Sequence, residues 1–382
     1  MKSHFFHFLY FGFFSWFCIA GPLHPIANYD MLPYVGSVLS YTDDTKVREH
    51  SLAEIKKYVS IEQYNTFISG SYYKEKVAND DRAFIEQLPG YRVKPLYILL
   101  IRFLGKAIEN IPLASVIISS VGFFLIGIAL FLLRPKGLFE SLWLILIPFV
   151  LYIGTPTFTL LPAVSSPDSL ATGLILMSVW TFLRKPQSVY SIILMSLAIL
   201  SRPDSIITII CFFPILIKMY SDRILNARWV TWAVAVPVMV YLLNKKFFPS
   251  FGVKELIIFA SKGPFPYLAS IDTSQFTEIY LSMLYKDIVS LIALPRFILF
   301  LIANIAFIYF CKNSYSKIIL VAALGNIVIK ILLFPNFDGG FGERFFFVSY
   351  FLILVSIFNK FQIPAKEEVV EMAKHQRSQL FP

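Results

Sequence analysis

An acidic residue, Asp30, follows the first apolar run of the chain at short distance. Residues 4–20 contain no charged side chain and predict a first membrane span, and Asp30 lies soon after it in the segment Asn-Tyr-Asp-Met-Leu-Pro-Tyr, residues 28–34. A carboxylate held at a membrane face can act as a general base on a substrate that itself lies in the membrane. The competing interpretation is a solvated loop acid without a catalytic role.

Further charged residues lie at the ends of apolar segments later in the chain. Lys94 opens a Lys-Pro pair, Asp168 ends Ser-Ser-Pro-Asp, Arg202 lies in Ser-Arg-Pro-Asp, and Glu343 and Arg344 form the acid-base pair of Phe-Gly-Glu-Arg. Charges in such surroundings are costly, which makes each a functional hypothesis. A lipid phosphate that leaves during a reaction needs cations to hold its charge, and Lys94, Arg202 and Arg344 are the candidates.

Each of these residues also has a simpler interpretation. Asp168 and Asp204 each follow a proline at the start of an apolar run, so either could be an acid that caps a helix or lies in its first turn. Arg202 could contact lipid headgroups. Tyr29 and Tyr34 are candidates for stacking on a sugar, although interfacial belts of aromatic residues explain such side chains more often.

The composition predicts an integral membrane protein. The 382 residues are 57% hydrophobic and only 15% charged, with a mean hydropathy of +0.67, whereas soluble domains average about 25% charged residues. The net charge of +10 then indicates cytoplasmic loops and anionic lipid headgroups as the partners of the basic residues, and no nucleic acid. The three cysteines lie in apolar runs and show neither a disulfide framework nor metal-ligand spacing.

The apolar runs predict an all-α polytopic protein with about ten transmembrane helices. We expect them near residues 5–20, 111–133, 138–154, 168–183, 188–201, 205–220, 229–244, 288–311, 318–334 and 345–359. The segment 95–108 is ambiguous, because Arg102 and Lys106 interrupt it. If it crossed the membrane, the basic loops near Arg134, Arg184 and Arg228 would face outward. If it lies in the interface, all three face the cytoplasm, as the positive-inside rule favours.

This orientation predicts a multi-pass protein of the plasma membrane, the inner membrane in bacteria, with both termini in the cytoplasm. A large extracytoplasmic loop, residues 21–110, would carry surface helices at 52–67 and 95–108, and a second outer loop would span 245–287. We divide the chain into a catalytic membrane module at 1–220, further spans at 221–359 and a cytoplasmic tail at 360–382. The N-terminal run is interpreted as an uncleaved signal anchor, with cleavage before Gly21 as the alternative.

The order of these elements resembles the C-type (GT-C) glycosyltransferases that use polyprenyl-phosphate sugars, above all the aminoarabinose transferases of lipid A modification and the protein O-mannosyltransferases. The resemblance rests on an acid after the first span (Asp30), a Lys-Pro pair opening a juxtamembrane helix (Lys94), an acid at the start of a later span (Asp168) and a basic residue ending the next one (Arg202). It covers residues 1–220 in organisation, and beyond them only the element around Arg344 looks similar.

The resemblance implies an inverting transfer on the extracytoplasmic side to a glycan, lipid or protein acceptor. Asp30 would be the general base or a carboxylate that orients the acceptor, Asp168 a second acid that could share a divalent metal ion with Asp30, and Lys94 and Arg202 the residues that bind the donor phosphate. The chemistry of a departing phosphate adds Arg344 to these cations. Tyr29, Tyr34 and Glu343 would contact the substrates. The chain lacks the additional acid that often neighbours the first one in that family, and it is shorter than those enzymes.

Two other functions stay open from the sequence. A flippase or transporter of a lipid-linked saccharide would place polar residues near the bilayer midplane, whereas most charges here lie at the ends of spans, with Lys330 as an exception. A polysaccharide polymerase is itself a transferase and is harder to separate.

Overall fold

The computed structural model describes residues 2–41, 46–135, 138–154, 156–252, 254–255, 257–258, 273–293, 295–311, 313–333, 344 and 346–358. Within these residues the regular structure is helical throughout, without a strand. The predicted all-α class is therefore confirmed. The predicted cytoplasmic tail, 360–382, lies outside the described residues.

Four helices are long and apolar enough to cross a membrane by themselves. These are α1 (Lys2–Leu23), α9 (Ile111–Leu132), α15 (Ala227–Phe247) and α19 (Ser314–Leu333). A fifth span results if α10 (Leu138–Gly154) is combined with the segment formed by α11 (Pro156–Leu160) and the 3-10 helix η1 (Leu161–Ala163), which meets it at 85°. The other predicted spans form shorter helices, so the count of about ten stays a prediction.

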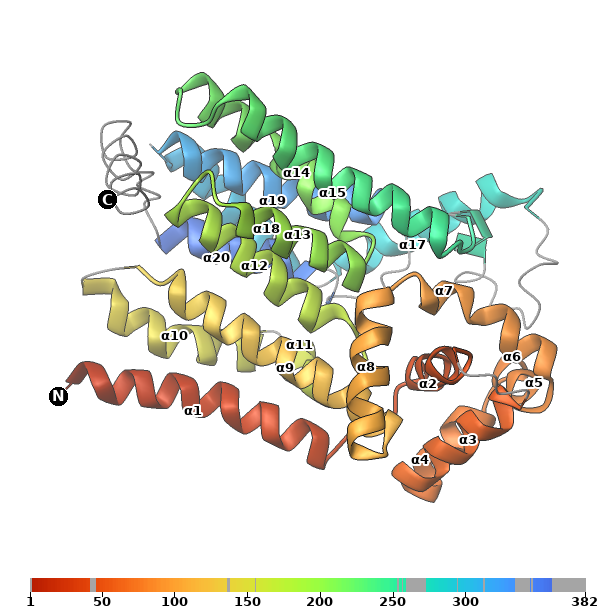
Figure 1. The fold of residues 1–382 in the computed structure, drawn as a ribbon. Coiled ribbons are helices and arrows are strands. Elements are labelled where there is room, and N and C mark those ends of the chain that lie inside the picture. The colour runs from red at the N-terminus through yellow and green to blue at the C-terminus, as the bar shows by residue number, and fades with distance from the viewer. Residues whose placement is uncertain are drawn as a thin grey trace, which may run out of the picture.

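The shorter helices complete one bundle with the long ones (Figure 1). They are α12 (Asp168–Arg184), α13 (Val189–Ser201), α14 (Ser205–Ser221), α18 (Pro295–Phe310) and α20 (Phe347–Phe358). The helix α12 packs mainly on α9 and α13. A glycine allows the first of these contacts, since a Cβ atom at Gly122 would lie only 2.3 Å from the backbone nitrogen of Leu170.

The first helix is an integral part of this bundle. Tyr10 and Phe14 are fully buried, the Tyr10 hydroxyl donates a hydrogen bond of 2.7 Å to the Gly127 carbonyl, and Phe14 packs on the same glycine. Whether residues 4–20 are retained as an anchor stays a prediction.

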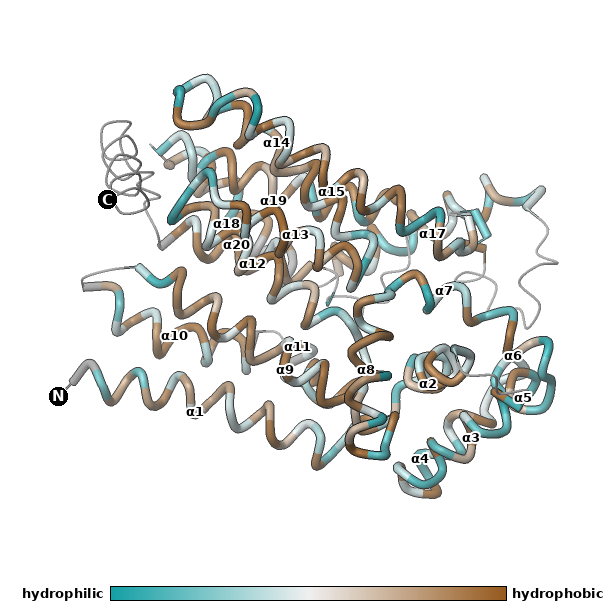
Figure 2. The backbone as a smooth tube through the Cα atoms, viewed as in Figure 1, coloured by the Kyte–Doolittle hydropathy of each residue, from teal (hydrophilic) through white to brown (hydrophobic). Residues whose placement is uncertain are grey.

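The segment between α1 and α9 forms a separate layer of short helices at one end of the bundle (Figure 1). It consists of α2 (Met31–Leu39), α3 (Val47–Tyr58), α4 (Ile61–Ile68), α5 (Tyr72–Asn79), α6 (Asp81–Gln87), α7 (Pro89–Arg92) and α8 (Pro95–Ile108). The layer has its own apolar core, which includes Met31, Val35, Ile55 and Phe84. Figure 2 shows α3 to α6 as largely hydrophilic and the bundle helices as largely apolar.

The helix α8 runs across the direction of the bundle helices (Figure 1). One face, with Tyr97 and Ile101, is buried, while Leu99, Arg102 and Phe103 are exposed on the other. An exposed face that mixes apolar and basic side chains is typical of a helix in a membrane interface. The predicted helix at 95–108 is confirmed, and its place at the membrane surface stays a prediction.

Two predicted helices are wrong in their extent. The expected single helix at 52–67 is divided into α3 and α4, because Ser60 adopts an extended backbone and its side chain caps α4 by accepting a hydrogen bond from the Gln63 amide. The expected span at 288–311 is divided into α17 (Phe276–Ile292) and α18, which begins at Pro295. Proline suits the first position of a helix, because its missing N–H has no partner within the helix there, which agrees with α18 beginning at Pro295.

Candidate functional site

Asp30 lies at the N-terminus of α2, on the side of the outer layer that faces the bundle. Its Oδ1 accepts a hydrogen bond of 3.0 Å from the Tyr91 hydroxyl, and its Oδ2 lies 3.5 Å from Nη2 of Arg344. Asp30 makes no side-chain capping hydrogen bond to α2. The carboxylate is therefore engaged by side chains from two distant parts of the chain, and the interpretation of Asp30 as a solvated loop acid is wrong.

Asp168 is buried at the first position of α12. Its Oδ2 accepts a hydrogen bond of 2.6 Å from the Ser166 hydroxyl and lies 3.2 Å from Nε of Arg344, while its Oδ1 forms an ion pair with Arg202. It is also the acidic residue in the first turn of this helix. Arg344 thus joins Asp30 and Asp168, two acids that are far apart in the sequence.

The ion pairs continue from Arg202 into the bundle. Nε of Arg202 lies 2.6 Å from Oδ1 of Asp204, and Oδ2 of Asp204 lies 3.5 Å from Nζ of Lys330 in α19. Burial by itself would raise the pKa of Asp204, but the charges of Arg202 and Lys330 hold it at about 2. Asp204 is therefore ionised at neutral pH.

Lys94 lies on the other side of Asp30, inside a cage of tyrosine side chains. Its Nζ donates a hydrogen bond of 2.7 Å to the Tyr34 hydroxyl and lies 4.9 Å from the ring centroids of both Tyr34 and Tyr91. Burial lowers the pKa of Lys94 to about 8, and the nearby charge of Asp30 opposes this shift. Lys94 is thus largely protonated at pH 7 and loses its proton as the pH rises above about 8.

These groups form one cluster of alternating charge across the interface between the outer layer and the bundle. Among the residues that the structure describes, its seven charged side chains are four cations and three acids, which leaves one net positive charge when all are ionised. The cluster consists of Lys94, Asp30, Arg344, Asp168, Arg202, Asp204 and Lys330. Such a site attracts an anion and presents carboxylates beside it.

Hydrogen bonds between side chains and the backbone connect the segments that carry Asp30 and Asp168. The Asn28 side chain donates to the Ser165 carbonyl and accepts from the Ser165 amide, both at 3.0 Å, as a neighbouring strand would do. Beyond Ser165, the Ser119 hydroxyl of α9 accepts from the Ser166 amide at 3.0 Å. The loop before α12 is therefore fixed to both α9 and the segment that carries Asp30.

The structure brings together five of the predicted site residues: Asp30, Lys94, Asp168, Arg202 and Arg344. Asp168 lies in the first turn of α12, as one interpretation of the sequence predicts, and its carboxylate also pairs with Arg202 and Arg344. Asp204 takes the N-cap position of α14 but makes no side-chain capping hydrogen bond there.

The predicted substrate-contacting residues give a different result. Tyr34 is buried among Lys94, Tyr91 and Tyr97, so its ring offers no open face for a sugar. Tyr29 is partly buried, and its hydroxyl donates to Oε1 of Gln87 at 3.4 Å. Glu343 lies outside the described residues.

Sequence reasoning missed several residues of the cluster. Lys330 stood out only as a charge inside an apolar run, which is a signal of function in a membrane helix. Asp204 was noted beside Arg202 without a site role. Tyr91 and Asn28 had no signal, because their roles depend on contacts across distant segments.

The described donors do not fit a divalent metal ion shared by Asp30 and Asp168. Both oxygens of Asp168 are engaged by arginines, and Arg344 bridges the two acids. No group of three or more His, Cys, Asp or Glu side chains in the described part of the chain could hold such an ion. No chemical step is therefore derived through a metal, and a dependence of the activity on metal stays a prediction of the sequence.

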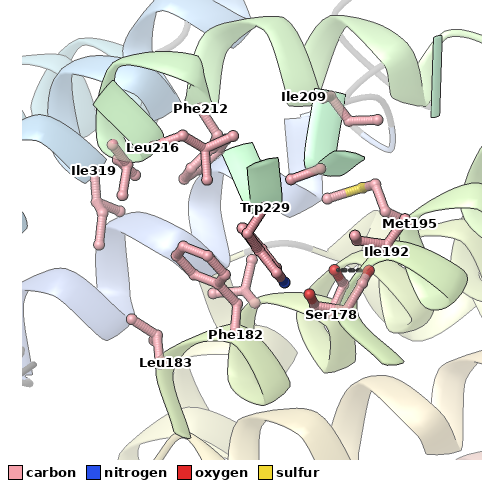
Figure 3. A pocket seen from close by; sticks show the side chains of 14 residues that line it. Ser178, Phe182, Leu183, Ile192, Met195, Ile209, Phe212, Leu216, Trp229 and Ile319 are labelled. Carbon is pink, nitrogen blue, oxygen red and sulfur yellow. Dashed lines mark hydrogen bonds between the residues drawn. The ribbon is translucent and has the colours of Figure 1, made fainter. Parts of the chain in front are cut away.

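Two cavities adjoin α12. The smaller one, of about 10 Å³, is lined by charged residues of the cluster, including Arg202, Lys330 and Arg344. The larger one, of about 90 Å³, lies further along α12 and is almost entirely apolar, with Phe182, Met195 and Trp229 in its wall (Figure 3). Ser178 at its edge donates to the Ser191 carbonyl. The larger cavity thus offers apolar contact and no ionisable group.

Comparisons with protein-family models, with curated proteins and with solved structures find no match for this chain. The functional argument therefore rests on the residues and geometry of the cluster.

Proposed function

We propose that this protein is a multi-pass membrane glycosyltransferase of the GT-C type. It would move a sugar from a polyprenyl-phosphate donor to a hydroxyl of an extracytoplasmic acceptor, with inversion at the anomeric carbon. The observation that supports this proposal best is the bridge formed by Arg344 between Asp30 and Asp168. In the proposed reaction, this guanidinium would face the departing phosphate and the Asp30 carboxylate beside it would accept the proton.

The proposed reaction is a single displacement. Asp30 takes the proton of the acceptor hydroxyl while the acceptor oxygen forms a bond to the anomeric carbon. The bond between that carbon and the phosphate oxygen breaks, and its electron pair leaves with the lipid phosphate. Arg344 and Arg202 stabilise the charge that develops on the phosphate, and Lys94 adds a third positive charge close to Asp30.

The contacts of Asp168 favour a role in positioning the two arginines for this reaction. It holds Arg202 and Arg344 at the same carboxylate and is itself buried. An arginine that is held in place before the substrate arrives loses less side-chain freedom on binding phosphate. Asp168 is therefore proposed as the positioning residue of the phosphate-binding arginines.

The orientation of the chain supports an outer active site. Arg134 and Lys185 follow α9 and α12, and Arg228 lies in the first turn of α15. These helix ends lie away from α8 (Figure 1). By the positive-inside rule these ends face the cytoplasm. We propose a location in the plasma membrane, with about ten membrane-embedded helices and the cluster at the outer face.

A transporter of a lipid-linked saccharide is the second candidate, and Lys330 is the observation that favours it. This lysine is buried within α19, whereas a purely interfacial enzyme needs no charge inside a span. The polymerase alternative shares the transfer chemistry and differs only in its acceptor.

Mass spectrometry of glycolipids and glycans from cells with and without the gene tests the assignment. A transferase adds the mass of one sugar to a product that is lost without the gene and restored by the wild-type protein. A transporter leaves all masses unchanged and alters only the membrane face on which a lipid-linked saccharide accumulates. Unchanged masses in both strains refute the transferase.

A further inference from the structure

The inner end of the charged cluster forms a wall around the 10 Å³ cavity. Arg202, Lys330 and Arg344 line this cavity together with Asp168 and the polar side chains Thr172 and Ser205. Three cations and one acid thus converge on a space of about one water molecule. Asp204 lies behind this wall and contacts both Arg202 and Lys330.

The position of Lys330 argues against a purely structural ion pair. It lies about one helical turn before the end of α19 at Leu333, which is roughly 5 Å along the helix. A charged side chain within a span is costly, and well-packed apolar residues usually join two helices at least as well as a buried ion pair does. A ligand that Lys330 binds would account for its presence.

The charges of donor and product differ. A polyprenyl-phosphate sugar is a phosphodiester with one negative charge, whereas the lipid phosphate left after transfer is a monoester with about −1.5 to −2 at pH 7. A strongly cationic site would therefore hold the product more tightly than the donor. In the observed cluster, the three acids reduce the charge of four cations to a net value of +1.

We propose that Lys330 belongs to the inner wall of the phosphate site and that Lys330 and Asp204, which lies behind this wall, together set the selectivity of the site between the two forms of the lipid. Lys330 binds a phosphate oxygen, in place of its contact with Asp204. Asp204 keeps the net charge of the site low, so that the phosphodiester donor binds and the more highly charged product is released. This inference rests on the proposed function, because it takes the lipid phosphate as the ligand.

Binding of two non-reacting lipids tests the proposal without turnover. The probes are a polyprenyl monophosphate and its methyl ester, which carries the single charge of the donor. Dissociation constants for both are measured on the full-length protein in lipid nanodiscs at pH 7.5. The variants are Lys330→Gln and Asp204→Asn, and Lys317→Gln near the opposite end of α19 is the matched control.

The two variants should act in opposite directions. Lys330→Gln should raise the dissociation constants of both lipids about tenfold or more, as expected for the loss of a charge-assisted hydrogen bond. Asp204→Asn should lower the dissociation constant of the monophosphate about tenfold and that of the methyl ester by less. The added positive charge of the site attracts the monophosphate more strongly, because the monophosphate carries the larger negative charge. Lys317→Gln should leave both constants unchanged.

A structural ion pair gives a different pattern, since either substitution breaks the same contact. Equal weakening by both variants, an unchanged affinity in both, or no binding of either lipid by the wild-type protein overturns the proposal. Melting temperatures of all variants separate a folding defect from a change in affinity. If the expected pattern of binding occurs but no sugar is transferred, the proposed enzymatic function is refuted and the phosphate site stands.

Discussion

Replacement of Asp30 by asparagine separates its chemical role from its structural one. The amide is nearly isosteric and can still accept the hydrogen bond of the Tyr91 hydroxyl, which is 3.0 Å long in the wild-type protein. It loses the charge that faces Arg344 at 3.5 Å. Because both side chains of this pair are partly exposed, the pair contributes about 1 kcal/mol or less to the free energy of unfolding.

The expected loss of activity is much larger than this structural cost. A positioned general base contributes about 10²- to 10⁴-fold to a rate, which corresponds to roughly 3–5 kcal/mol of the activation barrier. We therefore expect kcat of Asp30→Asn to fall by at least about a hundredfold, while the donor KM and the melting temperature change little. The assay is the initial rate of transfer from a radiolabelled polyprenyl-phosphate sugar, measured beside thermal unfolding in the same detergent.

Asp81→Asn is the matched control, because Asp81 is an exposed acid of the same outer layer that pairs with Arg48. It should turn over at the wild-type rate. Turnover by Asp30→Asn within about threefold of the wild-type rate refutes the general-base assignment. A loss of rate that is accompanied by an equal loss of folded protein assigns Asp30 a structural role instead.

Three further substitutions test other parts of the site. Lys94→Ala should raise the donor KM about tenfold. Burial lowers the pKa of Lys94 to about 8, so its positive charge is present below that pH and is lost above it. The wild-type donor KM should therefore rise above pH 8, whereas Lys94→Arg should show no such rise. Gly122→Ala should lower the free energy of unfolding by about 1–3 kcal/mol in a denaturation experiment, because its Cβ would lie 2.3 Å from the Leu170 nitrogen and force α9 and α12 apart. Asn28→Ala should lower kcat more than it changes the donor KM, since it removes both 3.0 Å hydrogen bonds to Ser165 and loosens Asp30 relative to Asp168.

Each of these substitutions has a control within the chain. Lys57→Ala changes an exposed lysine of α3, Gly12→Ala places a methyl group in open space, and Asn79→Ala removes an exposed amide of α5. A flat dependence of the wild-type KM on pH would contradict the role of Lys94. Equal stability of the two glycine variants would contradict the close approach of α9 and α12, and a wild-type kcat in Asn28→Ala would show that its contacts do not position Asp30.

The sequence was sufficient to predict the helical class and most helix positions, because apolar runs bounded by charges are a local signal. It also singled out five of the seven charged residues of the cluster, since each lies at the end of an apolar run. The division at Pro295 is not evident from the sequence, because apolar residues on both sides of the proline continue the pattern of a single span.

The remaining residues could not be predicted, because their roles depend on contacts between distant segments. Lys330 becomes part of the site only through Asp204, 126 positions earlier, and Asn28 only through Ser165, 137 positions later. The burial of Tyr34 likewise follows from the packing of α2 against Tyr91 and Tyr97. Such pairings depend on how the helices assemble.

The spread of the charged cluster along the chain has a consequence for biogenesis. Asp30 enters the membrane environment with the first helix, whereas its partner Arg344 lies within the last tenth of the 382 residues. During synthesis, Asp30 and Asp168 therefore lack their ion-pair partner Arg344 while most of the helices are inserted. The charged cluster is thus expected to be complete only after Arg344 has been synthesised, and a product truncated before Arg344 would expose unmatched carboxylates to proteases that remove incomplete proteins.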